Sequence, residues 1–257
     1  MVTIEINGLE KSFAGTNGVR PVLHGINLVV AKGEVIAIRG DNGCGKTTLL
    51  NIICGVESKT GGTITFVSEF DHKLRVGYTQ QDYTSSLLPW FNVLDNVAIP
   101  LRIQQVGKAE RKRKANELLD SLGFRNLPKA AFPHQLSGGQ KQRIAVARAL
   151  IHEPQLLLMD EPFANLDAHS SRDLQETLSL IHDKVRPTII YVSHELDHCI
   201  YLADRVFLLH GSPASIVHTF EIPLPRPRRR EVVLSSDFTQ IRSKILAAEE
   251  SLYAKKA

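Results

Sequence analysis

The chain alternates short runs of β-branched and aliphatic residues with segments in which apolar residues recur every three or four positions. The first pattern is typical of buried strands and the second of amphipathic helices, so the alternation predicts an α/β fold built around a sheet. The runs of strand length span residues 34–40, 61–66, 75–79, 155–160 and 188–194.

Residues 109–123 show the helical pattern most clearly. Their apolar positions follow the spacing i, i+3, i+4, i+7, at Ala115, Leu118, Leu119 and Leu122. This stripe predicts one buried face, and the lysines and arginines of the segment are expected on the solvated face. A helix is also predicted at residues 46–55, and residues 204–220 are expected to form a hairpin that turns at Gly211-Ser212-Pro213.

The stretch "IPLPRPRRR", from Ile222 to Arg230, indicates a stiff, basic, proline-rich linker. Beyond it, Phe238, Ile241 and Ile245 recur at helical spacing and predict a short last helix. We expect the arginines of the linker to be solvated or to dock on a protein, and not to form a nucleic-acid patch.

Composition narrows the class of protein. The 257 residues are 43% hydrophobic, enough for a sizeable core, and the net charge of +4 is too small to indicate nucleic-acid binding. Three cysteines without a C-x-x-C pair argue against a disulfide framework or a zinc site. No window reaches the roughly 18 apolar residues of a membrane span, so any membrane attachment is expected to go through a partner.

The strongest chemical signal is "GDNGCGKTT", which fits G-x-x-x-x-G-K-[ST] between a predicted strand and a predicted helix. In such a loop backbone N–H groups surround phosphates, Lys46 neutralises their charge, and the Thr47 hydroxyl binds Mg²⁺. The residues expected to hold the nucleotide here are Gly40, Asp41, Asn42, Gly43, Cys44, Gly45, Lys46, Thr47 and Thr48. The motif predicts binding of a nucleoside triphosphate, ATP or a relative, with magnesium.

Two carboxylates follow another predicted strand, at Asp160 and Glu161. Ligands of such sheets sit at the carboxyl ends of the strands, so Asp160 is placed to reach the magnesium ion and Glu161 to orient or deprotonate an attacking water. The alternative is an ordinary helix start before Pro162. His194, just past a further strand, is a candidate contact to the γ-phosphate or a structural histidine.

A second anion site is predicted where Ser137, Gly138 and Gly139 open a helix, because free N–H groups and the positive end of the helix dipole converge there. With this turn the chain resembles the ATP-binding subunits of ABC transporters. The matching segments are the phosphate loop Gly40–Thr48, the signature "LSGGQ" Leu136–Gln140, the magnesium strand "LLLMDE", the contact loop "NLD" Asn165–Asp167 and the switch histidine His194. They occur in the family's order, and the resemblance runs from Phe13 to His210.

The resemblance implies that two copies face each other head to tail and that each ATP is shared. Ser137, Gly138, Gly139 and Gln140 of one copy would then complete the site at Lys46 of the other. It also implies catalytic roles for Glu161, His194, Gln81 and Lys46, and magnesium contacts for Thr47, Gln81 and Asp160. Phe13 is expected to stack on adenine, and we prefer Gln81 to Gln80 from the count starting at Gly77.

The segment after Gln81 contains the only tryptophan, Trp90, in "LLPW" followed by "VLDNV". Trp90 is either a core residue or part of the groove that, in this family, receives a helix of the permease. These motifs, together with "LPRPR" at 224–228, resemble importers of nitrate, sulfonates, taurine and bicarbonate. Related permeases for pyrimidine-like compounds share the same motifs. The expected partners are a membrane permease and, indirectly, an extracytoplasmic solute-binding protein, with the chain peripheral on the cytoplasmic face.

The resemblance also implies the domain plan. Residues 1–223 form the ATP-binding domain, with an N-terminal antiparallel β-subdomain and a helical subdomain at about 82–154, and residues 224–257 form the linker and last helix. The alternative function is a non-transport ABC ATPase acting on DNA or the ribosome. A P-loop kinase or GTPase is disfavoured by the complete signature and by the absence of N-K-x-D.

Overall fold

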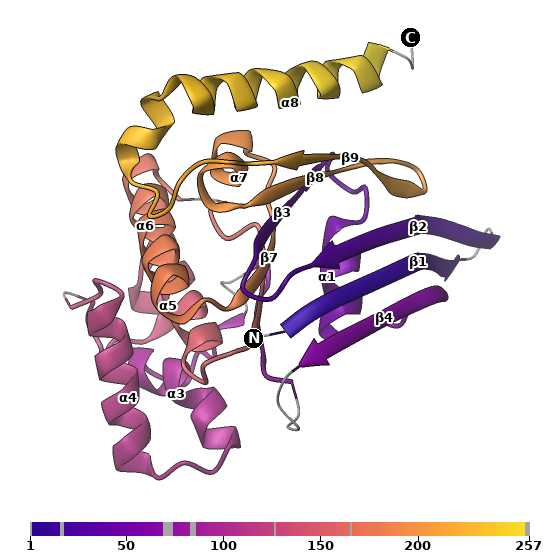
Figure 1. Ribbon diagram of the computed structural model, residues 1–257. Coiled ribbons are helices and arrows are strands. Elements are labelled where there is room, and N and C mark those ends of the chain that lie inside the picture. Colours follow the sequence, from indigo (N-terminus) through magenta and orange to yellow (C-terminus); the bar gives the residue numbers. More distant parts are fainter. Residues whose placement is uncertain are drawn as a thin grey trace.

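The computed structural model describes residues 2–15, 18–68, 74–82, 86–125, 127–164 and 166–254. In this part of the chain the strands form a nine-stranded sheet with the order β4-β1-β2-β9-β8-β3-β7-β6-β5 (Figure 1). The strands are β1 Val2–Gly15, β2 Gly18–Val30, β3 Val35–Gly40, β4 Gly61–Ser68, β5 Val76–Thr79, β6 Leu156–Asp160, β7 Thr188–Val192, β8 Arg205–Gly211 and β9 Ala214–Glu221.

The centre of the sheet is parallel. β3 pairs with β7 and β8, and β6 pairs with β5 and β7, all in parallel register. Every residue of β6 and β7 is buried, which explains why these strands read in the sequence as continuous apolar runs without alternation. The predicted α/β fold is confirmed, and the parallel strands direct their carboxyl ends toward one edge.

The other end of the sheet is antiparallel. β1 pairs with β2 and β4, and its first residues alternate between buried and solvent-facing, as in a sheet with one covered face. This N-terminal subdomain meets the rest at β2 and β9, where Leu23 pairs with Ala214. Apolar residues of both parts and of helix α1 (Lys46–Cys54) share one core cluster, so the two parts of the sheet pack on the same helix.

The helices that cover the sheet and extend from it are α3 Val93–Ile103, α4 Lys108–Ser121, α5 Gly138–Leu150, α6 Ala168–Val185, α7 Leu196–Leu202 and α8 Ser236–Ala254, with 3-10 turns η1 Pro133–Gln135 and η2 Arg230–Leu234. Figure 1 shows α3 and α4 away from the sheet, at the lower left. In α4, Ala115 and Leu119 are buried, whereas Arg113 is exposed and pairs with Glu110 and Glu117, as the apolar stripe predicts. Within the described residues, no helix is both long and apolar enough to cross a bilayer.

The structure sharpens the sequence expectation for the C-terminal region in two ways. The predicted hairpin forms as β8 and β9, and the linker after it docks rather than being solvated at Arg228, which is buried and donates to the carbonyls of Ile200, Tyr201 and Ala203 at the end of α7. The reason is that the end of α7 leaves several carbonyls without helical partners, and a guanidinium satisfies them together.

The last helix is also longer than expected. α8 contains 19 residues and runs across the top of the molecule in Figure 1. Phe238 and Ile245 are fully buried and Ile241 is partly buried against the main core, so the predicted apolar stripe is confirmed. The tail is therefore packed onto the ATP-binding domain along its length.

Candidate active site

A pocket of about 510 Å³ opens where β3 and β6 end. We call it the phosphate-loop pocket. It is lined by Phe13, Arg20, Val22, Asn42, Gly43, Gly45, Lys46, Thr47, Thr48, Gln81, Asp160 and Glu161. Most candidates from the sequence thus meet in one place, although they come from segments up to 148 residues apart (161 − 13).

The loop between β3 and α1 requires glycine at two positions for steric reasons. Gly45 has φ of 107°, and a Cβ there would lie 2.9 Å from the side chains of Leu23 and Val22. A Cβ on Gly40 would lie 2.2 Å from the carbonyl oxygen of Leu209. α1 has no side-chain cap and no acidic residue in its first turn, so its first N–H groups are left for an anion.

Backbone carbonyls of the loop hold Lys46 in place. Its ammonium is buried and donates to the carbonyl oxygens of Gly40 and Asp41, both at 2.8 Å. A buried ammonium needs such partners, and phosphate oxygens with their negative charge are stronger acceptors than carbonyls. The loop therefore keeps a charge in place that a triphosphate would use.

Asp160 ends β6 as a buried carboxylate, and neither of its oxygens has a hydrogen-bond partner of good geometry. Burial raises the pKa of Asp160, while the nearby Thr47 hydroxyl and the Lys46 ammonium act in the opposite direction. A buried carboxylate next to a hydroxyl, with the amide of Gln81 on the same wall, offers the oxygen ligands that Mg²⁺ prefers. These residues fit a magnesium site.

Glu161 has an unusual backbone and a defined partner. Its φ is 49°, a left-handed conformation that non-glycine residues rarely adopt outside functional sites. Gln142 of α5 holds this turn by donating to the Pro162 carbonyl. The buried carboxylate lies 2.8 Å from Nδ1 of His194 and accepts the backbone N–H of the same residue at 3.3 Å. The acid and the histidine thus form a pair at the pocket wall.

The signature residues lie elsewhere. Ser137 caps α5, and the Gln140 N–H donates to its hydroxyl at 3.3 Å, while the Ser137 N–H donates to the Gln140 side chain at 2.9 Å. This is a complete capping box. None of Ser137, Gly138, Gly139 and Gln140 lines the phosphate-loop pocket, so the structure does not bring the two predicted anion sites together within one chain.

Sequence reasoning missed Arg20 and Val22, both on the pocket wall. Arg20 lies opposite Phe13 in the β1–β2 pairing, and the Lys11 ammonium lies 4.4 Å from the centre of the Phe13 ring. The sequence signal for Arg20 is a basic residue on a strand next to an aromatic residue that faces the ligand. This signal can be recognised only when the register between β1 and β2 is known.

Three candidates line neighbouring pockets instead: Gly40, Asp41 and His194 contact a smaller pocket beside α8. Cys44 lines another, next to Arg20. Asn165 of the contact loop falls outside the described residues. Trp90 is 67% exposed, so of the two alternatives for this residue the core position is wrong.

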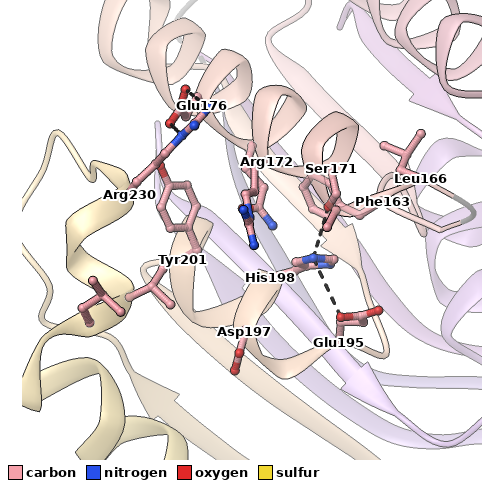
Figure 2. Close-up of a pocket in the computed structure, with 14 residues that line it drawn as sticks. Phe163, Leu166, Ser171, Arg172, Glu176, Glu195, Asp197, His198, Tyr201 and Arg230 are labelled. Atoms are coloured by element: carbon pink, nitrogen blue, oxygen red, sulfur yellow. Dashed lines mark hydrogen bonds and ion pairs between the residues drawn. The ribbon is translucent and has the colours of Figure 1, made fainter.

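A further pocket, of about 580 Å³, lies between α6, α7 and η2 (Figure 2). It is lined by Phe163, Leu166, Tyr201 and several charged side chains, and His198 contacts Ser171 at its wall. None of the predicted site residues lines it. It is therefore separate from the phosphate-loop pocket, although Phe163 follows Glu161 by only two residues.

A phosphate loop between a parallel strand and a helix, with acidic residues at the end of a neighbouring strand, defines a P-loop nucleoside triphosphatase. Residues 23–164 match the family described as ABC transporter, and the chain belongs to this family. Its ATP-binding subunits are ATPases coupled to transport, which confirms ATP as the nucleotide and ATP hydrolysis as the activity.

The chain is 35% identical to the aliphatic sulfonates import ATP-binding protein SsuB of Bacillus cereus, over 95% of each chain. It is 36% identical to the nitrate import ATP-binding protein NrtD of Synechococcus elongatus, over 92% of this chain and 87% of that one. The dimeric structure of MJ0796, described as a bacterial ABC transporter cassette, matches 86% of this chain and all of its own with 25% identity and a TM-score of 0.76. These relatives support a transport ATPase over an ATPase acting on DNA or the ribosome.

Proposed function

We propose that this chain hydrolyses Mg-ATP in the phosphate-loop pocket and thereby drives import of a small anion or organic solute through a separate permease. The observation that carries the proposal is the buried Glu161, hydrogen-bonded to His194 and adjacent to the unpartnered carboxylate of Asp160. Buried acids in this arrangement are expensive to maintain unless a ligand uses them.

Each residue of the pocket has a distinct task in this proposal. Lys46 exchanges its loop carbonyls for the β- and γ-phosphate oxygens, and Glu161 accepts the proton of the attacking water while His194 holds the carboxylate and contacts the γ-phosphate. Phe13 stacks on adenine. Thr47, Asp160 and Gln81 would hold magnesium, which when bound neutralises charge on the phosphates.

A second copy completes the site. The signature turn at Ser137 lies outside the phosphate-loop pocket of its own chain, yet it presents the N-terminus of a 13-residue helix, which favours an anion. We infer that Ser137, Gly138, Gly139 and Gln140 of one copy contact the γ-phosphate bound by the other. The MJ0796 structure is described as dimeric, which supports a dimer of this chain.

The permease contact is proposed at the surface around Trp90, just before α3. Trp90 and Ile103, at the two ends of this helix, are 67% and 77% exposed, and Ile103 lines a shallow groove with Tyr78 and Leu88. The chain would then be peripheral, on the cytoplasmic face of the membrane. The named relatives import sulfonates and nitrate, so we propose a solute of that size and charge, delivered by a solute-binding protein.

The test co-expresses the chain with a candidate membrane permease and measures assembly, ATPase activity and uptake of nitrate, sulfonate, taurine or bicarbonate in proteoliposomes. Trp90→Ala is expected to keep the ATPase activity of the isolated subunit and to lose assembly. Leu234→Ala, which removes an exposed apolar side chain elsewhere, is the matched control and should assemble normally. Normal assembly of Trp90→Ala, or a chain that activates no permease, contradicts the proposal.

A further inference from the structure

Helix α8 is attached to the segment that carries His194 at several points. Its buried Phe238 and Ile245 join the main core, which includes residues of α7 directly after His194. In addition, Arg242 donates to Asp197 in the first turn of α7, at 2.7 Å. The C-terminal helix therefore contacts the polypeptide that follows the switch histidine, independently of the contact described next.

A second attachment reaches His194 itself through Arg39, the residue of β3 that precedes Gly40 of the phosphate loop. The guanidinium of Arg39 donates to both carboxylate oxygens of Glu249 in α8, with Nε at 2.5 Å and Nη2 at 3.1 Å. Its remaining nitrogen, Nη1, donates to the backbone carbonyl of His194. The two side chains are only 16% and 15% exposed, so solvent screens the pair little.

The geometry of this contact restricts where the His194 backbone lies. A guanidinium is planar, so a carboxylate that accepts hydrogen bonds from two of its nitrogens also fixes the direction of the third nitrogen. The backbone of His194 in turn places the imidazole whose Nδ1 lies 2.8 Å from Glu161. A continuous path of polar contacts thus joins α8 to the acid at the pocket wall.

We propose that Arg39 and Glu249 are positioning residues for His194, so that the C-terminal helix sets the rate of ATP hydrolysis. Glu249 orients Arg39, and Arg39 holds the His194 carbonyl. The inference rests on the proposed role of His194 and adds a residue from the far end of the chain to the control of that site. Apolar packing docks α8 without the ion pair, so the pair is available for positioning.

The experiment compares Glu249→Gln with Glu250→Gln in the full-length protein. The glutamine at 249 keeps the shape of the side chain and loses the charge that orients Arg39, whereas Glu250 is exposed on the same helix. Glu249→Gln should lower kcat roughly fivefold and leave the KM for ATP unchanged, the size expected for coupling between residues in one network. Glu250→Gln should change neither quantity.

A double-mutant cycle then tests whether the effect passes through His194. In the background His194→Ala, assayed at an enzyme concentration high enough to resolve a residual rate, Glu249→Gln should have no further effect on kcat. An equal loss in both backgrounds, or an unchanged kcat in Glu249→Gln alone, overturns the inference. If His194→Ala by itself keeps the full rate, the proposed role of His194 fails instead, and the two failures are distinguished by this single variant.

Discussion

The phosphate-loop pocket and the signature turn are both proposed to contact phosphate, but their polar groups are in different states. In the pocket, the oxygens of Asp160 lack partners and Glu161 has a left-handed backbone. In the signature turn, Ser137 and Gln140 satisfy each other's N–H groups in a capping box. One region is incomplete without a ligand, and the other is complete as it stands.

This difference teaches where stability and function are in conflict. The pocket keeps a charge buried and a backbone strained, which costs stability in the free protein and is offset when a ligand binds. The signature turn stabilises its own helix and presents it as a rigid unit. Substitutions in the pocket should therefore affect ATP hydrolysis first. Substitutions in the signature turn should affect either the shared site or the stability of α5, depending on the size of the new side chain.

The largest effect is expected for Glu161→Gln. The amide keeps the shape and cannot accept a proton, so kcat for ATP should fall at least about 100-fold. ATP should still bind, and light scattering should show a dimer with ATP and a monomer with ADP. Adding Lys46→Ala should abolish that dimer by weakening ATP binding. Hydrolysis at close to the native rate in Glu161→Gln would show that Glu161 does not activate the attacking water.

The next largest effect is expected for Ser137→Arg. The bulky cation would enter the γ-phosphate site of the facing copy, so hydrolysis should fall at least about tenfold, while a single subunit still binds ATP. Ser121→Arg, at the exposed end of α4, is the control and should hydrolyse ATP normally. Measurement of nucleotide affinity and turnover for both variants checks this. Full turnover by Ser137→Arg argues against a shared site.

A smaller effect is expected for Asp160→Asn, which should increase the stability of the protein. Removing the buried charge should raise the free energy of unfolding of the nucleotide-free protein by about 1 kcal/mol. Because burial raises the pKa of Asp160, its charged form costs stability above that raised pKa, and the cost is absent at low pH, where the carboxyl is protonated in both states. The gain should therefore be seen at neutral pH, shrink as the pH falls through the raised pKa of Asp160, and be absent below the unfolded value of about 4. Equal stability of the two proteins at neutral pH would show that neighbouring groups offset the cost of burying the charge of Asp160.

The smallest effect is expected for Ser137→Ala. It removes the side-chain cap of α5 and should lower the free energy of unfolding by about 1 kcal/mol or less. Urea denaturation measures this, with Ser251→Ala, an exposed serine inside α8, as the control. If both variants have the same free energy of unfolding, the capping box does not stabilise the protein. The contrast drawn between the signature turn and the pocket is then wrong.

Much of the fold was predictable because its signals are local. Buried strands such as β6 and β7 are continuous apolar runs, the stripe of α4 is periodic, and the phosphate loop places its glycines and Lys46 within nine residues. The expectations that stayed open concern residues whose partners are distant. The basic linker was expected to be solvated or to dock, and Arg228 docks by donating to carbonyls 25 to 28 positions earlier in the chain, in addition to those of Ile222 and Leu224.

The sequence by itself determined the class of protein and the chemistry of the pocket, because steric demands on glycine, phosphate contacts and strand-end carboxylates follow from residue type and short spacing. Only the tertiary structure decided which side chains meet. It placed Arg20 beside Phe13 through strand register, separated the signature turn from the phosphate-loop pocket, and joined Arg39 to Glu249 across 210 positions. Such contacts depend on how elements pack in space, and residue pattern along the chain carries no record of that packing.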